Sequence, residues 1–174
     1  MNNNDGIERH IISVLVDNEP GVLARVIGLF SGRGYNIESL TVAEVEGKLG
    51  LSRISIVTSG TPMVIEQIKS QLARLVPIHS VRDLTEMGVA IERELALVKI
   101  INEGKNRIEA LRIADTFRAR TLDSTLDSFV FEVTGNSSKV AAFIDLMQSL
   151  GDVEIARTGV SAISRGNRID LTAK

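Results

Sequence analysis

The sequence predicts an α+β protein made of two copies of one β-α-β-β-α-β unit, and three observations lead to this prediction. Apolar, β-branched runs typical of strands alternate with stretches whose apolar residues recur every three or four positions, as in a helix that packs on one side. The same order of elements occurs twice within 174 residues. A chain of this length is long enough for two small domains of about 80 residues each. This order is that of ferredoxin-like domains.

The first half opens with an apolar, β-branched run at 10–16, which predicts a mostly buried strand. A turn at 17–21 leads into a helix over 22–30, whose apolar residues follow three- and four-residue spacings. Pro20 suits the first helical turn, where its missing N–H costs nothing, and two glycines after residue 31 end the helix. The remaining elements expected in this half are strands at 37–45 and 51–58 joined by a turn at 46–50, a helix at 61–75 and a strand at 77–84.

The second half repeats this order. We expect a strand at 94–101, a helix at 106–119, strands at 121–124 and 129–134, a helix at 137–150 and a strand at 153–158. The predicted organisation is a disordered N-terminus at 1–8, a first domain at 9–84, a linker at 85–93, a second domain at 94–166 and a flexible tail at 167–174. Domains this small bury only roughly 60% of their unfolded surface, so each is expected to need support from a neighbour.

The composition argues against several classes of function. The chain has 20 basic and 22 acidic residues, mixed along the sequence, so no basic stripe is available for nucleic acid. It has no cysteine, which excludes thiolate nucleophiles and cysteine-based zinc sites, and only two histidines, which excludes a histidine-rich metal centre. We therefore expect no nucleic acid, no metal and no cofactor in this chain.

No segment has the pattern of an active site or of a membrane anchor. His79 lies in a predicted strand and is interpreted as a structural residue. The N-terminal segment is polar, and no apolar run approaches the roughly 20 residues that span a bilayer. The sequence therefore predicts a cytoplasmic protein that does not bind a membrane and is not catalytic.

The turn at 17–21 is the one segment suited to a ligand. It connects a strand to the start of a helix, where backbone N–H groups and the positive end of the helix dipole favour a carboxylate. Gly21 lets the backbone approach closely, and the amide of Asn18 can donate to a carboxylate and accept from an ammonium group, as an amino acid requires. The residues alone leave a second interpretation open, which is a capped turn that binds nothing.

Several stretches resemble a known family. Asp17 to Leu23 and Gly34 to Leu40 resemble the opening of an ACT domain, the amino-acid-sensing module with a ferredoxin-like fold. The longer strings resemble the small subunit of acetolactate synthase (acetohydroxyacid synthase) in particular, over roughly residues 9–168; they lie at 25–31, 33–42, 92–100, 156–160 and 164–166.

The resemblance implies a non-catalytic regulatory subunit. Members of this family pair with a large catalytic subunit that uses thiamine diphosphate, magnesium and FAD. That enzyme condenses pyruvate with pyruvate or 2-oxobutyrate, the first shared step of branched-chain amino acid biosynthesis (valine, leucine and isoleucine). The small subunit raises the catalytic activity and confers feedback inhibition by valine. The ACT domains form a homodimer side by side, with the allosteric effector at their interface.

The resemblance also implies where valine binds. Asn18 and Gly21 are matched in the first loop, and Asn36 reaches the ligand from the partner chain. Leu23 and Ile37 are candidate walls for the branched side chain, although the residues alone equally allow them to be core. The predicted effector site consists of Asn18, Gly21, Val22, Leu23, Asn36 and Ile37.

Two other functions compete with this one. The chain could be a stand-alone ACT sensor that controls another enzyme or a transcriptional regulator, but the matches after residue 90 favour the acetolactate synthase family, because a generic sensor does not need them. A small enzyme on a ferredoxin-like scaffold is the third hypothesis. It predicts activity without any partner.

Overall fold

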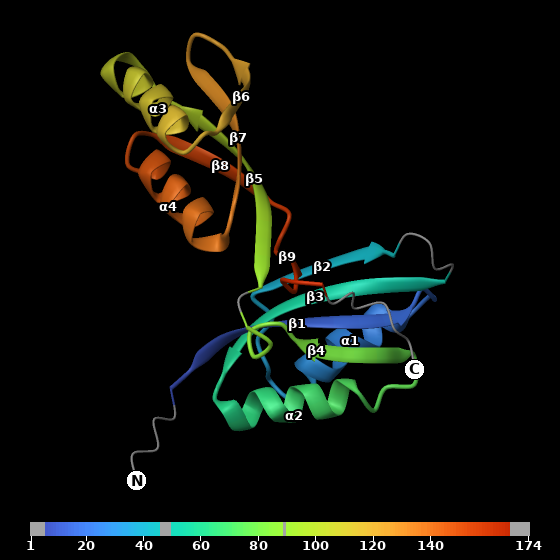
Figure 1. Ribbon diagram of the computed structural model, residues 1–174. Helices are drawn as coiled ribbons and strands as arrows, with labels where there is room; N and C mark the ends of the chain where they lie inside the picture. The colour runs from blue at the N-terminus through green and yellow to red at the C-terminus, as the bar shows by residue number, and fades with distance from the viewer. Residues whose placement is uncertain (1–5, 46–49, 89, 168–174) are drawn as a thin grey trace. The chain divides into compact units, whose positions relative to one another are not determined.

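The computed structural model describes residues 6–45, 50–88 and 90–167 of the chain. The chain divides into two compact units. The first contains the residues up to Ile91 together with those from Val160 onward, and the second contains Glu92–Gly159. Each unit has a hydrophobic core of its own and a β-α-β-β-α-β order (Figure 1).

The first unit is an antiparallel sheet with two helices. Strand β1 pairs with β3 along its whole length, from Glu8 opposite Gly60 to Asp17 opposite Leu51. The strands lie in the order β2-β3-β1-β4, so β2 and β4 form the two edges. The elements are β1 (Glu8–Asp17), α1 (Val22–Ser31), β2 (Ser39–Glu44), β3 (Leu51–Gly60), α2 (Pro62–Leu72) and β4 (Ile78–Asp83).

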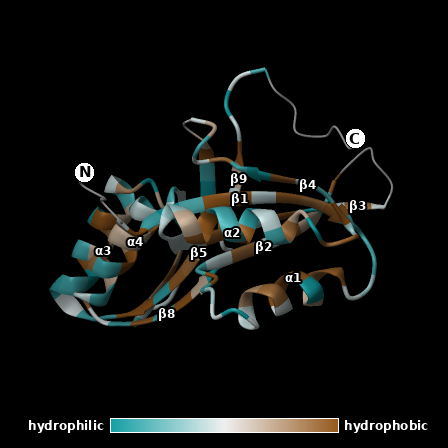
Figure 2. Ribbon diagram, turned by 90° about the horizontal axis from the view of Figure 1, so that it is seen from below, coloured by the Kyte–Doolittle hydropathy of each residue, from teal (hydrophilic) through white to brown (hydrophobic). Residues whose placement is uncertain are grey.

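Both helices pack on one face of this sheet. Ile12, Val14 and Val16 alternate along β1 and point to that face, where they pack with Val26 and Phe30 of α1. All five side chains are almost fully buried. Figure 2 shows β1 as hydrophobic over most of its length, whereas α1 carries both hydrophobic and hydrophilic residues. Burying one such side chain contributes about 1.5–3 kcal/mol, so this core fixes α1 and the loops at its two ends.

Helix α1 ends in a Schellman motif. Gly34 has a φ of 69°, the left-handed conformation that glycine adopts at little cost. The N–H of Tyr35 donates to the carbonyl oxygen of Phe30 at 3.0 Å, and that of Gly34 donates to Ser31 at 3.3 Å. The rings of Phe30 and Tyr35 meet edge to face, with centroids 6.2 Å apart. This motif fixes the direction in which the chain leaves α1, and hence the position of Asn36.

The second unit has the same order of elements and an equivalent strand order, β6-β7-β5-β8. Phe143 lies at the centre of its core, with its ring centroid 5.5 Å from that of Phe117 and 6.1 Å from that of Phe131. The elements are β5 (Ile91–Ile101), α3 (Gly104–Thr116), β6 (Arg120–Ser124), β7 (Ser128–Gly135), α4 (Ser137–Gln148) and β8 (Asp152–Arg157).

A last short strand, β9 (Ser161–Ile163), belongs to the first unit. The chain here covers part of the sheet face that carries no helix. The N–H of Val160 donates to Oγ of Ser39 at 2.7 Å, and Oγ1 of Thr41 donates to the Val160 carbonyl at 2.8 Å. The buried residues of this second, smaller cluster are Ile11, Val57, Leu84, Val160 and Ala162.

The predicted α+β class with two ferredoxin-like units is confirmed, and three details differ. The sequence places residues 160–166 in the second domain, but they group with the first, because Val160 and Ala162 complete the cluster on its open face. The predicted disordered N-terminus at 1–8 overlaps β1, which starts at Glu8. Pro20 lies just before α1 and not in its first turn, because Gly21 is the N-cap. Residues 1–5, most of the turn at 46–50 and the tail from 168 lie outside the described residues.

Candidate effector-binding site

The loop between β1 and α1 is anchored at its first two residues. The N–H of Asp17 donates to the carbonyl oxygen of Pro77 at 2.9 Å, and that of Asn18 donates to Gly50 at 2.7 Å. The carboxylate of Asp17 lies 2.6 Å from Nε2 of His79, which agrees with the interpretation of this histidine as structural. These bonds use backbone groups and leave the exposed side chain of Asn18 available at the surface.

Gly21 shapes the start of α1. Its φ of 87° is left-handed, and its carbonyl accepts the N–H of Arg25 at 3.1 Å. No side chain among the described residues caps this helix, and its first turn carries no acidic residue. A Cβ added at Gly21 would find no described atom within 4 Å. Because the first turn of any helix has N–H groups without an intrahelical acceptor, this end of α1 is open and electropositive.

The two apolar residues after Gly21 have different surroundings. Val22 is only 4% exposed and packs in the core under the helices, so its side chain is not available at the surface. Leu23 is 38% exposed and lies on the outside of the helix. Of these two predicted site residues, Leu23 is therefore the one whose side chain can contact a ligand.

Asn36 and Ile37 follow the other end of α1. The carbonyl of Asn36 accepts the hydroxyl of Thr58 at 2.7 Å, while its side chain is exposed and forms no hydrogen bond to any described residue. Ile37 is partly buried against the core. The N–H of Glu38 donates to Val57 at 2.9 Å and starts the pairing of β2. The backbone at Asn36 is thus fixed by the Thr58 hydroxyl and by the pairing that begins at Glu38, while the side-chain amide is free of described partners.

A single chain does not bring all the predicted site residues together. Gly21 and Asn36 lie at opposite ends of α1, and a helix of 10 residues is about 15 Å long at 1.5 Å per residue. Asn18 and Leu23 lie near Gly21, whereas Ile37 lies with Asn36. One small amino acid cannot contact both groups within one chain.

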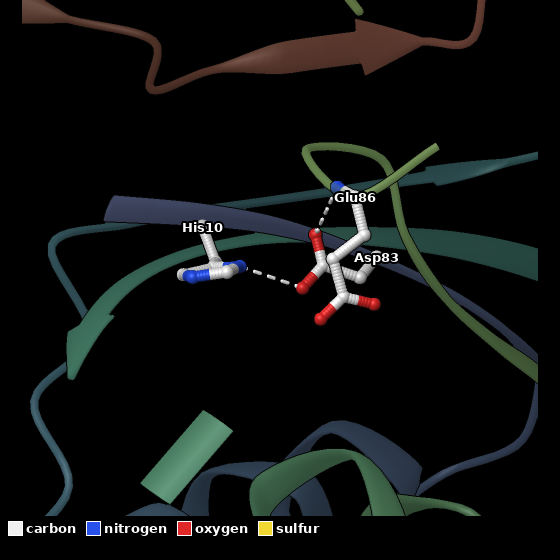
Figure 3. A group of neighbouring side chains, drawn as sticks. All are labelled: His10, Asp83 and Glu86. Carbon is white, nitrogen blue, oxygen red and sulfur yellow. Dashed lines mark hydrogen bonds and ion pairs between the residues drawn. The ribbon is translucent and has the colours of Figure 1, made fainter. Parts of the chain in front are cut away.

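A second group of polar side chains lies between β1, β4 and the turn after β4 (Figure 3). Nδ1 of His10 is 2.7 Å from Oδ2 of Asp83, and both residues are at least 94% buried. The other Asp83 oxygen accepts the N–H groups of Thr85 at 2.9 Å and of Glu86 at 3.3 Å. Donor atoms of His10, Asp83 and Glu86 lie within 4.8 Å of one another, which is close enough for a metal ion.

A lysine already provides the positive charge for this group. The Nζ atom of Lys69 lies 2.8 and 2.7 Å from the two carboxylate oxygens of Glu86. Burial lowers the pKa of Lys69, but hydrogen bonds to Glu66 and Glu86 and the charges of these carboxylates outweigh it and hold the pKa above its usual value. A metal ion would have to displace this ammonium group. We therefore interpret the group as a structural clamp between the two strands and the turn.

Replacing Asp83 by alanine should strongly destabilise the first unit. Nδ1 of the buried His10 loses its acceptor, and the N–H of Thr85 loses a partly buried one, so we expect a loss of about 3 kcal/mol in the free energy of unfolding. Urea denaturation measures it. Glu86→Ala is the control, because the half-exposed Glu86 should cost less than about 1 kcal/mol. Equal losses in the two variants would contradict the clamp.

The β-α-β-β-α-β fold and two family models define the class of protein. Residues 12–80 match a family model described as the AHAS small subunit-like ACT domain, and residues 93–166 match one described as the small subunit of acetolactate synthase. The chain contains an ACT domain. No helix within the described parts of the chain has the length and apolar character needed to cross a membrane.

The whole chain belongs to the family of acetolactate synthase small subunits. It is 49% identical to a probable acetolactate synthase small subunit of Archaeoglobus fulgidus, over 92% of this chain and 99% of that protein. It is 46% identical to the isozyme 3 small subunit of Escherichia coli, over 92% and 98% of the two chains. The crystal structure of the small subunit from Thermotoga maritima superposes with a TM-score of 0.81 at 40% identity, over 92% and 99% of the two chains.

Proposed function

We propose that this chain activates a thiamine-diphosphate-dependent acetolactate synthase catalytic subunit in the cytoplasm and makes it sensitive to valine. The observation that carries the proposal is the open, uncapped start of α1 beside Asn18 in a chain of this family. Thiamine diphosphate, magnesium and FAD belong to the catalytic subunit, and this chain contributes no catalytic group. Its role is regulation of branched-chain amino acid biosynthesis.

The chemistry of the loop suits an amino acid. The carboxylate of valine would accept N–H groups from the first turn of α1, where the helix dipole favours negative charge. The carbonyl oxygen of the Asn18 amide would accept from the ammonium group. Leu23 offers exposed apolar surface for the isopropyl group. Charge-assisted hydrogen bonds of about 1.5–3 kcal/mol each, less the ordering cost, give micromolar to millimolar affinity.

A homodimer would complete this site. Strand β2 is an edge of the sheet, and Val42 in this strand is 43% exposed on the helix side, since it pairs with the buried Ile54. Leu23 and Ile27 lie one turn apart on α1 and are 38% and 39% exposed. Pairing of two chains along β2 and α1 would cover this apolar surface.

The same pairing explains how Asn36 could take part. In a two-fold dimer whose axis is perpendicular to α1, the two α1 helices run antiparallel, so the start of one helix lies near the end of the other. The separation of about 15 Å within one chain becomes proximity between chains. Asn36 and Ile37 of one copy would then face Gly21 of its partner.

A mixing assay tests the proposed function. The purified chain is incubated with pyruvate, thiamine diphosphate, magnesium and FAD, with and without the catalytic subunit. We expect no activity alone, higher activity of the mixture than of the catalytic subunit alone, and inhibition of the mixture by valine. Activity of the chain alone would favour a small enzyme. No effect on the catalytic subunit, together with binding of an amino acid, would favour a stand-alone sensor.

Calorimetry identifies the preferred effector. Valine, leucine and isoleucine are each titrated into the small subunit, and we expect binding to be tightest for valine with one site at each α1 start. Inhibition requires that valine binds the two states of the assembly with different affinity. Heat signals absent for all three amino acids would contradict the site.

A further inference from the structure

The surface between α1 and α2 has a hollow of about 430 Å³ that the proposed effector site does not use. We name it the arginine groove. Arg25 and Leu29 lie one turn apart on one side of α1, and Arg33 lies in the turn after the helix. The other wall comes from the end of α2 and the residues after it. The lining residues are Arg25, Leu29, Arg33, Gln71, Arg74 and Leu75.

The charge of the groove is uncompensated. No acidic residue lines it, and Arg25, Arg33 and Arg74 form no ion pair with any described residue. Other arginines of the chain are paired, for example Arg112 with Glu109 and Arg157 with Glu94. Three guanidinium groups on one hollow, in a chain whose net charge is −2, create a local positive field that attracts an anionic partner.

Two further features favour a protein segment over a small inorganic anion. Oε1 of Gln71 is buried and has no hydrogen-bond partner, so it lacks a donor. A phosphate ion offers few donors, whereas a polypeptide brings N–H groups together with its carboxylates. Leu29 and Leu75 are partly buried against the core and give the groove an apolar wall. This mixture of apolar contact and positive charge is typical of a protein interface.

We propose that the arginine groove docks an acidic segment of the large catalytic subunit. The inference deepens the proposed function, since family membership supplies that partner. The groove also stays free in the proposed homodimer. At 100° per residue, Arg25 and Leu29 lie about 200° around α1 from Leu23 and Ile27 respectively, on the opposite flank of the helix. One flank of α1 thus serves the second copy, and the other serves the catalytic subunit.

Charge reversal tests the docking site. The double variant Arg25→Glu/Arg74→Glu changes two exposed side chains that hold no described partner, so the fold should persist. We expect its affinity for the purified catalytic subunit, measured by calorimetry, to fall at least tenfold at about 0.1 M salt. The parent's affinity should fall as salt rises, and that of Arg25→Ala/Arg74→Ala should depend less on salt. Valine binding to the free single variant Arg74→Glu should match the parent, because Arg74 lies outside α1 and away from its first turn.

The matched control is Lys105→Glu/Arg165→Glu, which makes the same change in charge at two exposed positions outside the groove. It should bind the catalytic subunit like the parent. Equal affinity of the groove variant and the parent would overturn the proposal, and so would an equal loss in the control. A further outcome is that inorganic phosphate raises the Tm of the parent and not that of the groove variant, while the parent and the groove variant bind the catalytic subunit equally. In that outcome the groove is a small-anion site and not a docking site. A parent that fails to activate the catalytic subunit counts against the proposed function instead.

Discussion

Replacing Gly21 by aspartate is expected to remove valine inhibition of the assembled enzyme and to leave its activation by the small subunit intact. The new carboxylate would occupy the open space at the start of α1 and accept the N–H groups intended for the carboxylate of valine. Aspartate adopts the left-handed conformation of Gly21 more readily than most residues, so the loop should keep its shape. We expect the half-inhibitory valine concentration to rise at least tenfold, measured in the mixing assay.

Gly21→Asn is the matched control for this substitution. Asparagine has nearly the same shape as aspartate and a similar tolerance of the left-handed conformation, but it lacks the negative charge. We expect it to retain more valine sensitivity than Gly21→Asp. Unchanged sensitivity in the aspartate variant would show that valine does not bind at this helix start. Equal losses in both variants would point to the shape of the loop and not to charge.

Phe143→Ala is expected to have the largest effect on stability. Phe143 is fully buried and lies between Phe117 and Phe131, so its loss leaves a cavity that the neighbouring rings cannot fill. Such substitutions cost about 3–5 kcal/mol, which is a large part of the stability of a unit this small. The second unit should unfold at a lower temperature. The first unit has a separate core, so calorimetry should still detect valine binding.

The matched control lies in the other core. Phe30 is 1% exposed and packs under α1, the helix that carries the proposed effector site. Phe30→Ala should cost a similar free energy and should also weaken valine binding, because α1 loses its anchor. Loss of valine binding in Phe143→Ala but not in Phe30→Ala would contradict the assignment of the effector to the first unit.

Most of the fold could be predicted because its signals are local. The apolar run at 10–16 lies within β1, and the helical spacing at 22–30 matches α1 almost residue for residue. Strand β9 could not be predicted, since it has three residues and depends on a sheet formed more than 70 residues earlier. Its short run has no periodicity of its own, and Val160 and Ala162 are buried by residues far away in the sequence.

The site was predictable only in part. The open loop at Gly21 follows from a turn before a helix, but the burial of Val22 depends on how α1 is rotated on the sheet. The pair of His10 and Asp83 joins residues 73 positions apart and has no pattern in the sequence. The sequence shows the spacing of Arg25, Leu29 and Arg33, but not that Arg74, which follows α2, lies across a hollow from them.

The polypeptide leaves the first unit after Ile91 and comes back at Val160, so the second unit is an insertion within the first. A premature stop anywhere in the insertion would delete the returning segment as well. The truncated product would then expose the apolar side chains of Ile11, Val57 and Leu84 to water. A truncated copy of this chain would therefore expose an apolar patch that favours aggregation.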